Sequence, residues 1–242
     1  MGETLSRLEA RLSLRLSVIV PMLDEAAQLP ELFAHLLPCR QAGCEIIFAD
    51  GGSTDGSANL VEVAGFTVLR AACGRARQMN AGAAIASGEV LLFLHADTRL
   101  PGDAARHIDH ALAQSGHCWG RFDVRISGRS FMLRVVASLM NWRSRLTGIA
   151  TGDQAMFMTR RAFESAGGFP DQTLMEDVEL SRRLLALSRP ICLADRVTTS
   201  GRRWEAHGVW RTIWLMWRLR WAYWRGTDAA ELARLYQRAW QE

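Results

Sequence analysis

The sequence predicts an α/β protein whose mostly parallel sheet is flanked by helices. Short apolar runs alternate with helical patterns over the first hundred residues, and Gly- and Asp-rich turns separate them. This alternation is typical of parallel sheets, because each helix returns the chain to the edge where the next strand begins. The 242 residues contain no linker or internal repeat and fit one domain with a small appendage.

The first half of the chain gives the clearest elements. Residues 12–20 alternate between apolar and polar side chains and then become continuously apolar, which indicates a strand that Pro21 ends. Apolar residues at helical spacing follow over 25–37. Further strands are expected over 45–49, 66–69 and 90–94, and further helices over 57–64 and 76–87. The last of these strands is apolar throughout, as central parallel strands are.

Beyond residue 100 the pattern is mixed. We expect a helix over 101–113, a strand over 119–127, a helix over 129–146, a strand over 154–159, a helix over 176–188 and an aromatic helix from 207. The chain then divides into an N-terminal extension (1–14), an α/β domain (15–205) and C-terminal amphipathic helices (206–242).

The composition excludes several functional classes. All 29 basic residues are Arg and none is Lys, which excludes a P-loop, a kinase ion pair and a Schiff base. Phosphates must therefore be bound by Arg, backbone N–H groups or a metal. The net charge of +4 is spread without a basic block, which argues against a nucleic-acid partner. Five Cys without a CxxC pair favour a reduced, cytoplasmic setting.

Charged residues follow several predicted strands at the edge where parallel sheets bind ligands. Glu25 and Asp50 follow the first two strands, where carboxylates can accept hydrogen bonds from a base or ribose. Arg75 and Arg77 open a helix whose N-terminal N–H groups suit a phosphate. Asp97 follows the most apolar strand, where a carboxylate needs a cation or hydrogen-bond donors. Each feature also has a purely structural interpretation as a turn or a helix cap.

Five motifs occur in a fixed order along the chain. They are Ser17-Val18-Ile19-Val20-Pro21 with Glu25, Asp50-Gly51-Gly52-Ser53-Thr54-Asp55-Gly56-Ser57, the segment 74–80, His95-Ala96-Asp97, and Gly167-Gly168-Phe169 before Glu176-Asp177. In this order they resemble the family-2 glycosyltransferases of the GT-A fold, over roughly residues 15–205. The resemblance implies a nucleotide-diphospho-sugar donor, a divalent metal and inversion at the anomeric carbon. The Leu-His-Ala-Asp-Thr form is similar to a bacterial subgroup labelled for arsenosugar biosynthesis.

The resemblance also implies roles for individual residues on the donor side. The nucleotide-sugar residues would be Pro21, Glu25, Asp50, Asp55, Arg75, Arg77, His95 and Asp97. Asp97 matches the last acid of the family's Asp-x-Asp metal motif, whereas His95 replaces the first acid. Because imidazole suits Mn²⁺ better than Mg²⁺, we expect a preference for Mn²⁺, or a further metal ligand such as His207.

On the acceptor side the resemblance implies a carboxylate general base. We expect Asp177 to be this base, with Glu176 as the alternative. Both lie in the first turn of a predicted helix, where the macrodipole favours the charged form, so they could also serve the helix alone. Gly152, Asp153 and Gln154 would line the acceptor pocket, or would only form the turn that leads into a strand.

A stripe of Trp residues distinguishes the C-terminal segment. The five are Trp210, Trp214, Trp217, Trp221 and Trp224, spaced by four and three residues, with Arg211, Arg218 and Arg225 beside them. The apolar run 209–224 is too short and too charged to span a bilayer. The stripe would therefore lie on a membrane, at its inner face, or pack against the catalytic domain or a second subunit in a homodimer.

Two other functional classes remain open on the sequence alone. A nucleotidyltransferase shares the sheet and the metal carboxylate, but more often uses a Gly-rich loop with Lys, which this chain lacks. A non-catalytic nucleotide-sugar binder or a membrane-associated scaffold is consistent with the incomplete metal motif. Neither the base, the sugar nor the acceptor follows from these residues.

Overall fold

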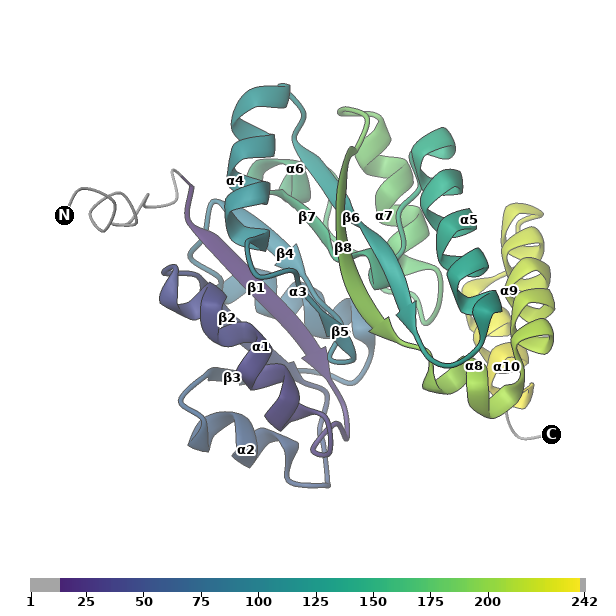
Figure 1. The fold of residues 1–242 in the computed structure, drawn as a ribbon, viewed down its shortest axis with the longest axis horizontal. Coiled ribbons are helices and arrows are strands. Elements are labelled where there is room, and N and C mark those ends of the chain that lie inside the picture. The colour runs from purple at the N-terminus through teal and green to yellow at the C-terminus, as the bar shows by residue number, and fades with distance from the viewer. Residues whose placement is uncertain (1–13, 240–242) are drawn as a thin grey trace.

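Eight strands form one sheet with helices on both faces in the computed structural model, which describes residues 14–239 (Figure 1). The strands are β1 (Leu16–Met22), β2 (Glu45–Asp50), β3 (Thr67–Arg70), β4 (Val90–Phe93), β5 (Thr98–Arg99), β6 (Trp119–Ser127), β7 (Met156–Thr159) and β8 (Ile191–Ser200). The helices are α1 (Leu29–Gln41), α2 (Ser57–Val63), α3 (Arg75–Ile85), α4 (Ala104–Ser115), α5 (Phe131–Thr147), α6 (Arg160–Ser165), α7 (Glu176–Leu185), α8 (Arg202–His207), α9 (Val209–Trp224) and α10 (Ala229–Arg238). A 3-10 turn, η1 (Gly152–Gln154), precedes β7. Almost all of the predicted N-terminal extension, 1–14, lies outside the described residues.

The sheet is mostly parallel, which confirms the predicted fold class. Its strand order is β3-β2-β1-β4-β7-β6-β8-β5. β1 pairs in parallel with β2 and β4, β2 with β3, and β6 with β8, whereas β7 is antiparallel to β4 and β6 and β5 is antiparallel to β8. Only β5 and β7 therefore run against the other six strands. The carboxyl ends of β1, β2 and β4 consequently share one edge with the beginning of β7.

Two apolar layers fix the helices to the sheet. Alternate residues of β1 enter opposite layers, with Val18 and Val20 in the cluster that contains Leu32 of α1. Ile19 enters the cluster on the α3 face. A Cβ on Gly82 of α3 would lie only 2.6 Å from Ile19 Cγ2, so this helix–strand approach requires glycine. The fold thus has three layers, helix, sheet and helix.

The predictions for the first strand and helix need correction. Pro21 does not end β1 but lies inside it, buried and opposite Ala49 of β2. The first helix begins at Leu29 rather than at residue 25. The N–H groups of Glu25 and Ala26 instead bind side chains of the 53–57 turn, which holds residues 24–28 in a loop.

Several elements after β4 were not predicted. β8 was missed because most of its residues are only partly buried, so it lacks a clear alternation of apolar and polar residues. β5, α6 and α8 are each six residues or shorter. α8 runs across the predicted domain boundary at residues 205 and 206, and it follows β8 at the edge where β1 and β4 end.

The C-terminal helices pack on the segment that begins α7. Leu215 and Leu219 of α9 form a small core with Met175 and with Leu232 of α10. The aromatic helix is therefore attached to the rest of the molecule by the face opposite its Trp residues. Among residues 14–239, no helix has the length and apolarity needed to cross a bilayer.

Candidate active site

The candidate site lies at the sheet edge where β1, β2 and β4 end. η1 approaches this edge because β7 is antiparallel, and the first turn of α7 faces it. The described residues other than Gly with positive φ are Asp24 (53°), Ala155 (47°) and Met175 (64°). They follow β1, precede β7 and precede α7 respectively. Such strained backbone positions gather at functional sites, and here all three lie on the connections around one edge.

The turn after β2 holds Asp50 beneath it. The Asp50 side chain is buried and accepts hydrogen bonds from the Ser53 N–H at 3.1 Å and the Ser53 hydroxyl at 2.5 Å. Buried Gln78 of α3 donates to the carbonyls of Met22 at 2.7 Å and Ala49 at 2.8 Å, which fixes the ends of β1 and β2. Sequence reasoning missed this positioning role, because an amide on an amphipathic helix carries no motif.

Asp55 connects two loops of the donor side. Its carboxylate accepts from the Ser57 hydroxyl at 2.5 Å and from the Ala26 N–H at 2.9 Å. The Ser57 hydrogen bond is the main cause of the lowered pKa of Asp55. Both carboxylate oxygens are therefore used to hold the loop that carries Glu25.

Glu25 and Asp97 form an acidic pair at the strand ends. Burial, followed by the negative charge of Asp97, raises the pKa of Glu25. The positive charges of Arg202 and Arg203 of α8 oppose this rise, so both guanidiniums lie close enough to Glu25 to affect its pKa. The structure thus brings together a predicted metal ligand, a predicted nucleoside residue and two Arg that the sequence analysis did not select.

The two Arg predicted to face the donor point in different directions. Arg75 lies 3.5 Å from Glu176, across the gap between α3 and α7. Arg77 instead forms a surface pair with Asp171, at 2.7 Å and 3.0 Å. The prediction that either would face phosphate therefore stands only for Arg75, because Arg77 is engaged outside the site.

His95 faces Asp153 rather than Asp97. Its Nδ1 lies 3.4 Å from Asp153 Oδ1, and its side chain is 13% exposed. A Cβ on Gly152 would collide with the other ring nitrogen, Nε2. The imidazole therefore occupies a slot that exists only because residue 152 is glycine. Although partial burial acts in the opposite direction, the hydrogen bond and charge of His95 lower the pKa of Asp153.

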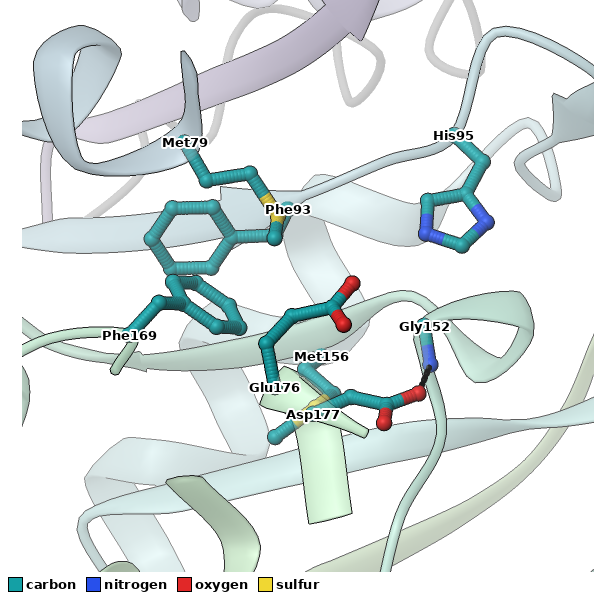
Figure 2. Close-up of a pocket in the computed structure, with 8 residues that line it drawn as sticks. All are labelled: Met79, Phe93, His95, Gly152, Met156, Phe169, Glu176 and Asp177. Atoms are coloured by element: carbon teal, nitrogen blue, oxygen red, sulfur yellow. Dashed lines mark hydrogen bonds between the residues drawn. The ribbon is translucent and has the colours of Figure 1, made fainter. Parts of the chain in front are cut away.

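A small cavity separates these groups from the apolar core (Figure 2). Its lining residues are Met79, Phe93, His95, Gly152, Met156, Phe169, Glu176 and Asp177. The volume is about 10 Å³, room for roughly one water molecule. Figure 2 shows the Glu176 carboxylate in the space between the rings of Phe93 and Phe169 on one side and His95 and Gly152 on the other. The centroids of the two rings are 4.8 Å apart.

The burial of Glu176 in this lining affects the pKa of its carboxyl group. Its side chain is 4% exposed. Burial, followed by the neighbouring Asp177, raises the pKa of Glu176, although Arg75 acts against this rise. The sequence had suggested that the helix N-terminus would lower the pKa of both acids. For Glu176 that expectation was wrong, because desolvation outweighs the macrodipole.

Asp177 is held in a fixed orientation beside this cavity. Its Oδ2 accepts from the Gly152 N–H at 2.8 Å, and its Oδ1 accepts from the Val178 N–H at 2.7 Å. These bonds join η1 to α7 and leave the carboxylate only partly buried. The Asp177 side chain is therefore more accessible to solvent than that of Glu176.

Two further guanidiniums face Asp177 from outside the cavity. Arg143 of α5 has buried Nε and Nη2 atoms that bind no other described residue. Burial, followed by the like charge of Arg220 of α9, lowers the pKa of Arg143 to about 10, while Asp177 opposes the fall. Burial also lowers the pKa of Arg220, against the charges of Asp177 and Asp153. Two partly buried guanidiniums that form no ion pair with a described residue indicate a place for an anionic group.

Gln154 was predicted to line the acceptor pocket, but in the structure it supports the turn that contains it. It is fully buried and accepts at Oε1 from the Thr151 N–H at 3.2 Å. Its amide lies 3.4 Å from Asn141 of α5. Gly152 lines the cavity and Asp153 lies against His95, whereas Gln154 is buried beneath the turn. Pro21 is likewise buried within the sheet.

The donor atoms around Asp97 fit a hard divalent cation. Asp97 and Glu25 offer carboxylate oxygens, which suit Mg²⁺ and Mn²⁺ alike. Within residues 14–239 no three His, Cys, Asp or Glu side chains are grouped to hold a metal by themselves. His95 is directed at Asp153, so its imidazole no longer supports a preference for Mn²⁺. His207 ends α8 and remains the proposed nitrogen ligand.

The Arg residues that sequence reasoning missed come from elements late in the chain. Arg202 and Arg203 begin α8, which follows the unpredicted strand β8. Arg143 and Arg220 lie on helices whose apolar patterns gave no sign that one flank would meet Asp177. Because all basic residues of the chain are Arg, the composition predicted that Arg would bind any anionic ligand, but it did not predict which Arg.

Residues 17–167, more than half of the chain, match the family described as glycosyl transferase family 2. Glu176 and Asp177 lie beyond the matched range. No curated protein matches the chain.

Solved structures share the fold at low sequence identity. Residues 1–349 of S. aureus TarS are 17% identical over 82% of this chain and 64% of that chain, with a TM-score of 0.63. The mannosyltransferase PcManGT from Pyrobaculum calidifontis, in complex with GDP-Man and Mn²⁺, is 20% identical over 82% and 60%, with a TM-score of 0.62. Glucosyl-3-phosphoglycerate synthase from Mycobacterium tuberculosis, in complex with Mn²⁺, UDP and glucosyl-3-phosphoglycerate, is 17% identical over 81% and 75%, with a TM-score of 0.56. The chain thus spans less than two thirds of the first two structures.

Proposed function

The chain belongs to glycosyl transferase family 2, and from this premise we propose that it moves a sugar from a nucleotide-diphospho-sugar to an acceptor hydroxyl with inversion. The chain is a glycosyltransferase with the GT-A α/β fold. The observation that carries the finer proposal is the meeting of Glu25, Asp97, Glu176 and Asp177 at one sheet edge. The arsenosugar subgroup remains part of this proposal.

The donor proposal is supported by what fold relatives contain. The Pyrobaculum protein holds GDP-Man with Mn²⁺, and the Mycobacterium protein holds UDP with Mn²⁺. In this chain we assign the nucleoside to the β1 and β2 ends, near Asp50 and Glu25, and the diphosphate to the region of Asp97. Arg202 and Arg203 would place fixed positive charge beside that diphosphate.

A divalent ion would be held by Asp97, with Glu25 beside it and His207 as a further candidate. The donor's phosphate oxygens would complete its shell, as is usual where a protein offers one or two carboxylates. When bound, the ion would neutralise negative charge that grows on the departing diphosphate.

For the acceptor side we assign Asp177 as the general base. In a single displacement the base removes the proton of the acceptor hydroxyl. At the same time the oxygen of that hydroxyl forms a bond to the anomeric carbon. The bond from that carbon to the phosphate oxygen breaks, and the nucleoside diphosphate leaves. The Gly152 N–H orients Asp177 for this role at 2.8 Å. Glu176 remains the alternative base, but its place in a one-water cavity favours a positioning role.

The test is to incubate the full chain with UDP- and GDP-sugars and Mn²⁺. A donor that binds the folded state will raise its melting temperature, which identifies the ligand before an acceptor is known. Release of UDP or GDP is the expected result. Pyrophosphate release would instead assign the chain to nucleotidyl transfer. Stable binding without any release, in the presence of diverse acceptors, would favour a nucleotide-sugar binder or scaffold.

A further inference from the structure

Helix α9 presents its five Trp side chains to solvent. Their exposed fractions are 70% for Trp210, 63% for Trp214, 72% for Trp217, 60% for Trp221 and 81% for Trp224. By contrast, Trp119 in the sheet is fully buried. A soluble domain does not normally expose five large aromatic rings along one helix, so this face indicates an interaction surface. We call these five residues the Trp stripe.

The stripe is narrow and faces away from the body of the protein. At 100° per residue, its members fall within about 80° of arc on the helix. Leu215 and Leu219 occupy the opposite side, in the small core with Met175. Val209 and Ile213 pack against the core cluster that includes residues of α5. Helix α9 therefore satisfies its own packing without the Trp stripe, which is left for another partner.

The charged residues of α9 and its C-cap are all Arg. Arg218 lies over the ring of Trp214 at 5.4 Å, and Arg225 lies over that of Trp221 at 5.1 Å. Helix α9 contains no Asp or Glu between Val209 and Trp224. Rings flanked by guanidiniums, without an acid among them, complement a surface that is apolar inside and negatively charged outside.

Helix α5 adds to this character. It also lacks Asp and Glu, and it exposes Leu139, Trp142 and Leu146 at helical spacing, with exposed fractions of 57%, 62% and 57%. Figure 1 shows α5 and α9 on the same side of the sheet, and both contribute to one core cluster. The apolar, acid-free character thus extends beyond a single helix.

We propose that the Trp stripe docks on an anionic lipid bilayer, with the rings at the interface and Arg218 and Arg225 at lipid phosphates. Trp suits this position because its ring is apolar while its N–H needs a polar partner. The helix lies on the surface and does not span it, since no described helix is long and apolar enough to do so. The core formed by Leu215, Leu219 and Met175 then holds the first turn of α7, with Glu176 and Asp177, within roughly one helix diameter, ~10 Å, of the bilayer.

The charges argue against a second copy of the chain as the occupant. A two-fold dimer would place the same face on both sides of the interface. Arg218 and Arg225 of each copy would then approach those of the other, with no acid of α9 to neutralise them. An anionic lipid surface supplies that negative charge, whereas a second stripe does not.

Vesicle binding tests the proposal without donor, acceptor or metal. The full chain is sedimented with vesicles of pure phosphatidylcholine and with vesicles of equal parts phosphatidylcholine and phosphatidylglycerol. We expect binding to the anionic vesicles, weakening with salt, and a blue shift of Trp emission. Replacing Trp214, Trp217 and Trp221 by Ala should weaken binding about tenfold or more. The double change R218Q/R225Q should mainly reduce the preference for anionic vesicles.

Matched controls exclude general effects of surface mutation. Val63→Ala removes an exposed apolar residue of α2, and Arg106→Gln removes a surface charge of α4, so neither should alter binding. Equal melting temperatures of all variants would show that the fold is intact.

Two results would overturn the proposal. One is no binding to anionic vesicles at low salt. The other is a concentration-dependent dimer, seen by analytical ultracentrifugation, that the triple Trp change abolishes while vesicle binding is absent or unchanged. Because the assay measures only lipid binding, a negative result would not bear on the proposed glycosyl transfer. Likewise, a failure to detect glycosyl transfer would not bear on lipid binding.

Discussion

The backbone N–H of Gly152 donates to Oδ2 of Asp177 at 2.8 Å, across 25 residues of chain. This bond connects the turn before β7 to the first turn of α7. The same Gly152 leaves room for the His95 ring, which approaches Asp153. One glycine therefore sets the relative positions of the predicted base and the His95–Asp153 pair.

Gly152→Ala should disrupt this arrangement. The added methyl group would overlap the His95 ring, so the turn or the imidazole must move. Overpacking of this kind costs about 1–3 kcal/mol, and a shift of about 1 Å at a catalytic group can cost roughly a hundredfold in rate. Thermal unfolding and nucleoside diphosphate release measure the two effects. Gly102→Ala is the control, because nothing lies within 4 Å of its Cβ position. Equal activity of G152A and G102A would contradict the placement.

Asp177→Asn should abolish transfer and leave donor binding nearly unchanged. An amide keeps the acceptor oxygen for the Gly152 N–H but cannot take a proton, and a lost general base costs roughly 10²–10⁴ in rate. Calorimetric donor affinity and turnover should therefore separate. Asp171→Asn removes a surface carboxylate bound to Arg77 and should keep full turnover. If D177N turns over normally while Glu176→Gln does not, the base is Glu176.

Glu176 should make stability depend on pH. Because its pKa is raised above the ordinary value of 4.5, the folded state binds its proton more tightly than the unfolded state. The resulting stabilisation is complete below pH 4.5 and is lost as the pH rises through the raised value. Urea unfolding across this window should show wild type losing stability relative to E176Q.

Glu45 provides a control of opposite sign for that experiment. Although desolvation acts against it, hydrogen bonds from Ser17 and Ser87 lower the pKa of Glu45 below 4.5. Its contribution is therefore present above pH 4.5 and lost as the pH falls through the lowered value. The difference in free energy of unfolding between wild type and E45Q should therefore become smaller as the pH falls. A pH-independent difference between wild type and E176Q would contradict the assigned shift.

Arg143→Met should stabilise the unliganded protein and impair transfer. The change removes two buried N–H-bearing nitrogens that bind no other described residue, and an unsatisfied buried group costs about 1–3 kcal/mol. Arg145→Met should instead lower stability without impairing transfer, because Arg145 donates to Asp123 through its two terminal nitrogens, Nη1 and Nη2, at 2.7 Å and 2.9 Å. Calorimetric unfolding and turnover of the pair measure both effects. A less stable R143M with full turnover would show that Arg143 is only a structural cation.

Metal dependence should follow Asp97. We expect EDTA to abolish transfer and Mn²⁺ to restore it better than Mg²⁺, with His207 as the ligand that makes the difference. Asp97→Asn should remove the Mn²⁺-dependent rise in melting temperature seen with UDP or GDP. Asp103→Asn, which affects only a surface pair with Arg106, should retain it. Full activity in EDTA would refute the metal dependence. Equal activity with Mn²⁺ and Mg²⁺ would refute the preference for Mn²⁺.

The sequence predicted most of the buried strands well, because they are either continuously apolar or carry apolar residues at alternate positions. The Val90–Phe93 strand and the Trp119–Ser127 strand lie where the pattern placed them. The half-buried strand Ile191–Ser200 gave no such signal, and Arg202 and Arg203 were missed with it. Pro21 was misplaced because its position in the sheet depends on pairing with Ala49, which local sequence does not encode.

By itself, then, the sequence determined the α/β class, the order of the strand-end motifs and the absence of lysine chemistry, since these depend on residue type and local spacing. Only the tertiary structure decided which motif residues face the site. It buried Gln154, turned Arg77 outward to Asp171 and directed His95 to Asp153. It also raised the pKa of Glu176 by burying its carboxyl group, and brought Arg143 and Arg220 near Asp177. The physical reason is that desolvation and charge proximity arise between segments far apart in the chain, and they exist only once those segments pack together.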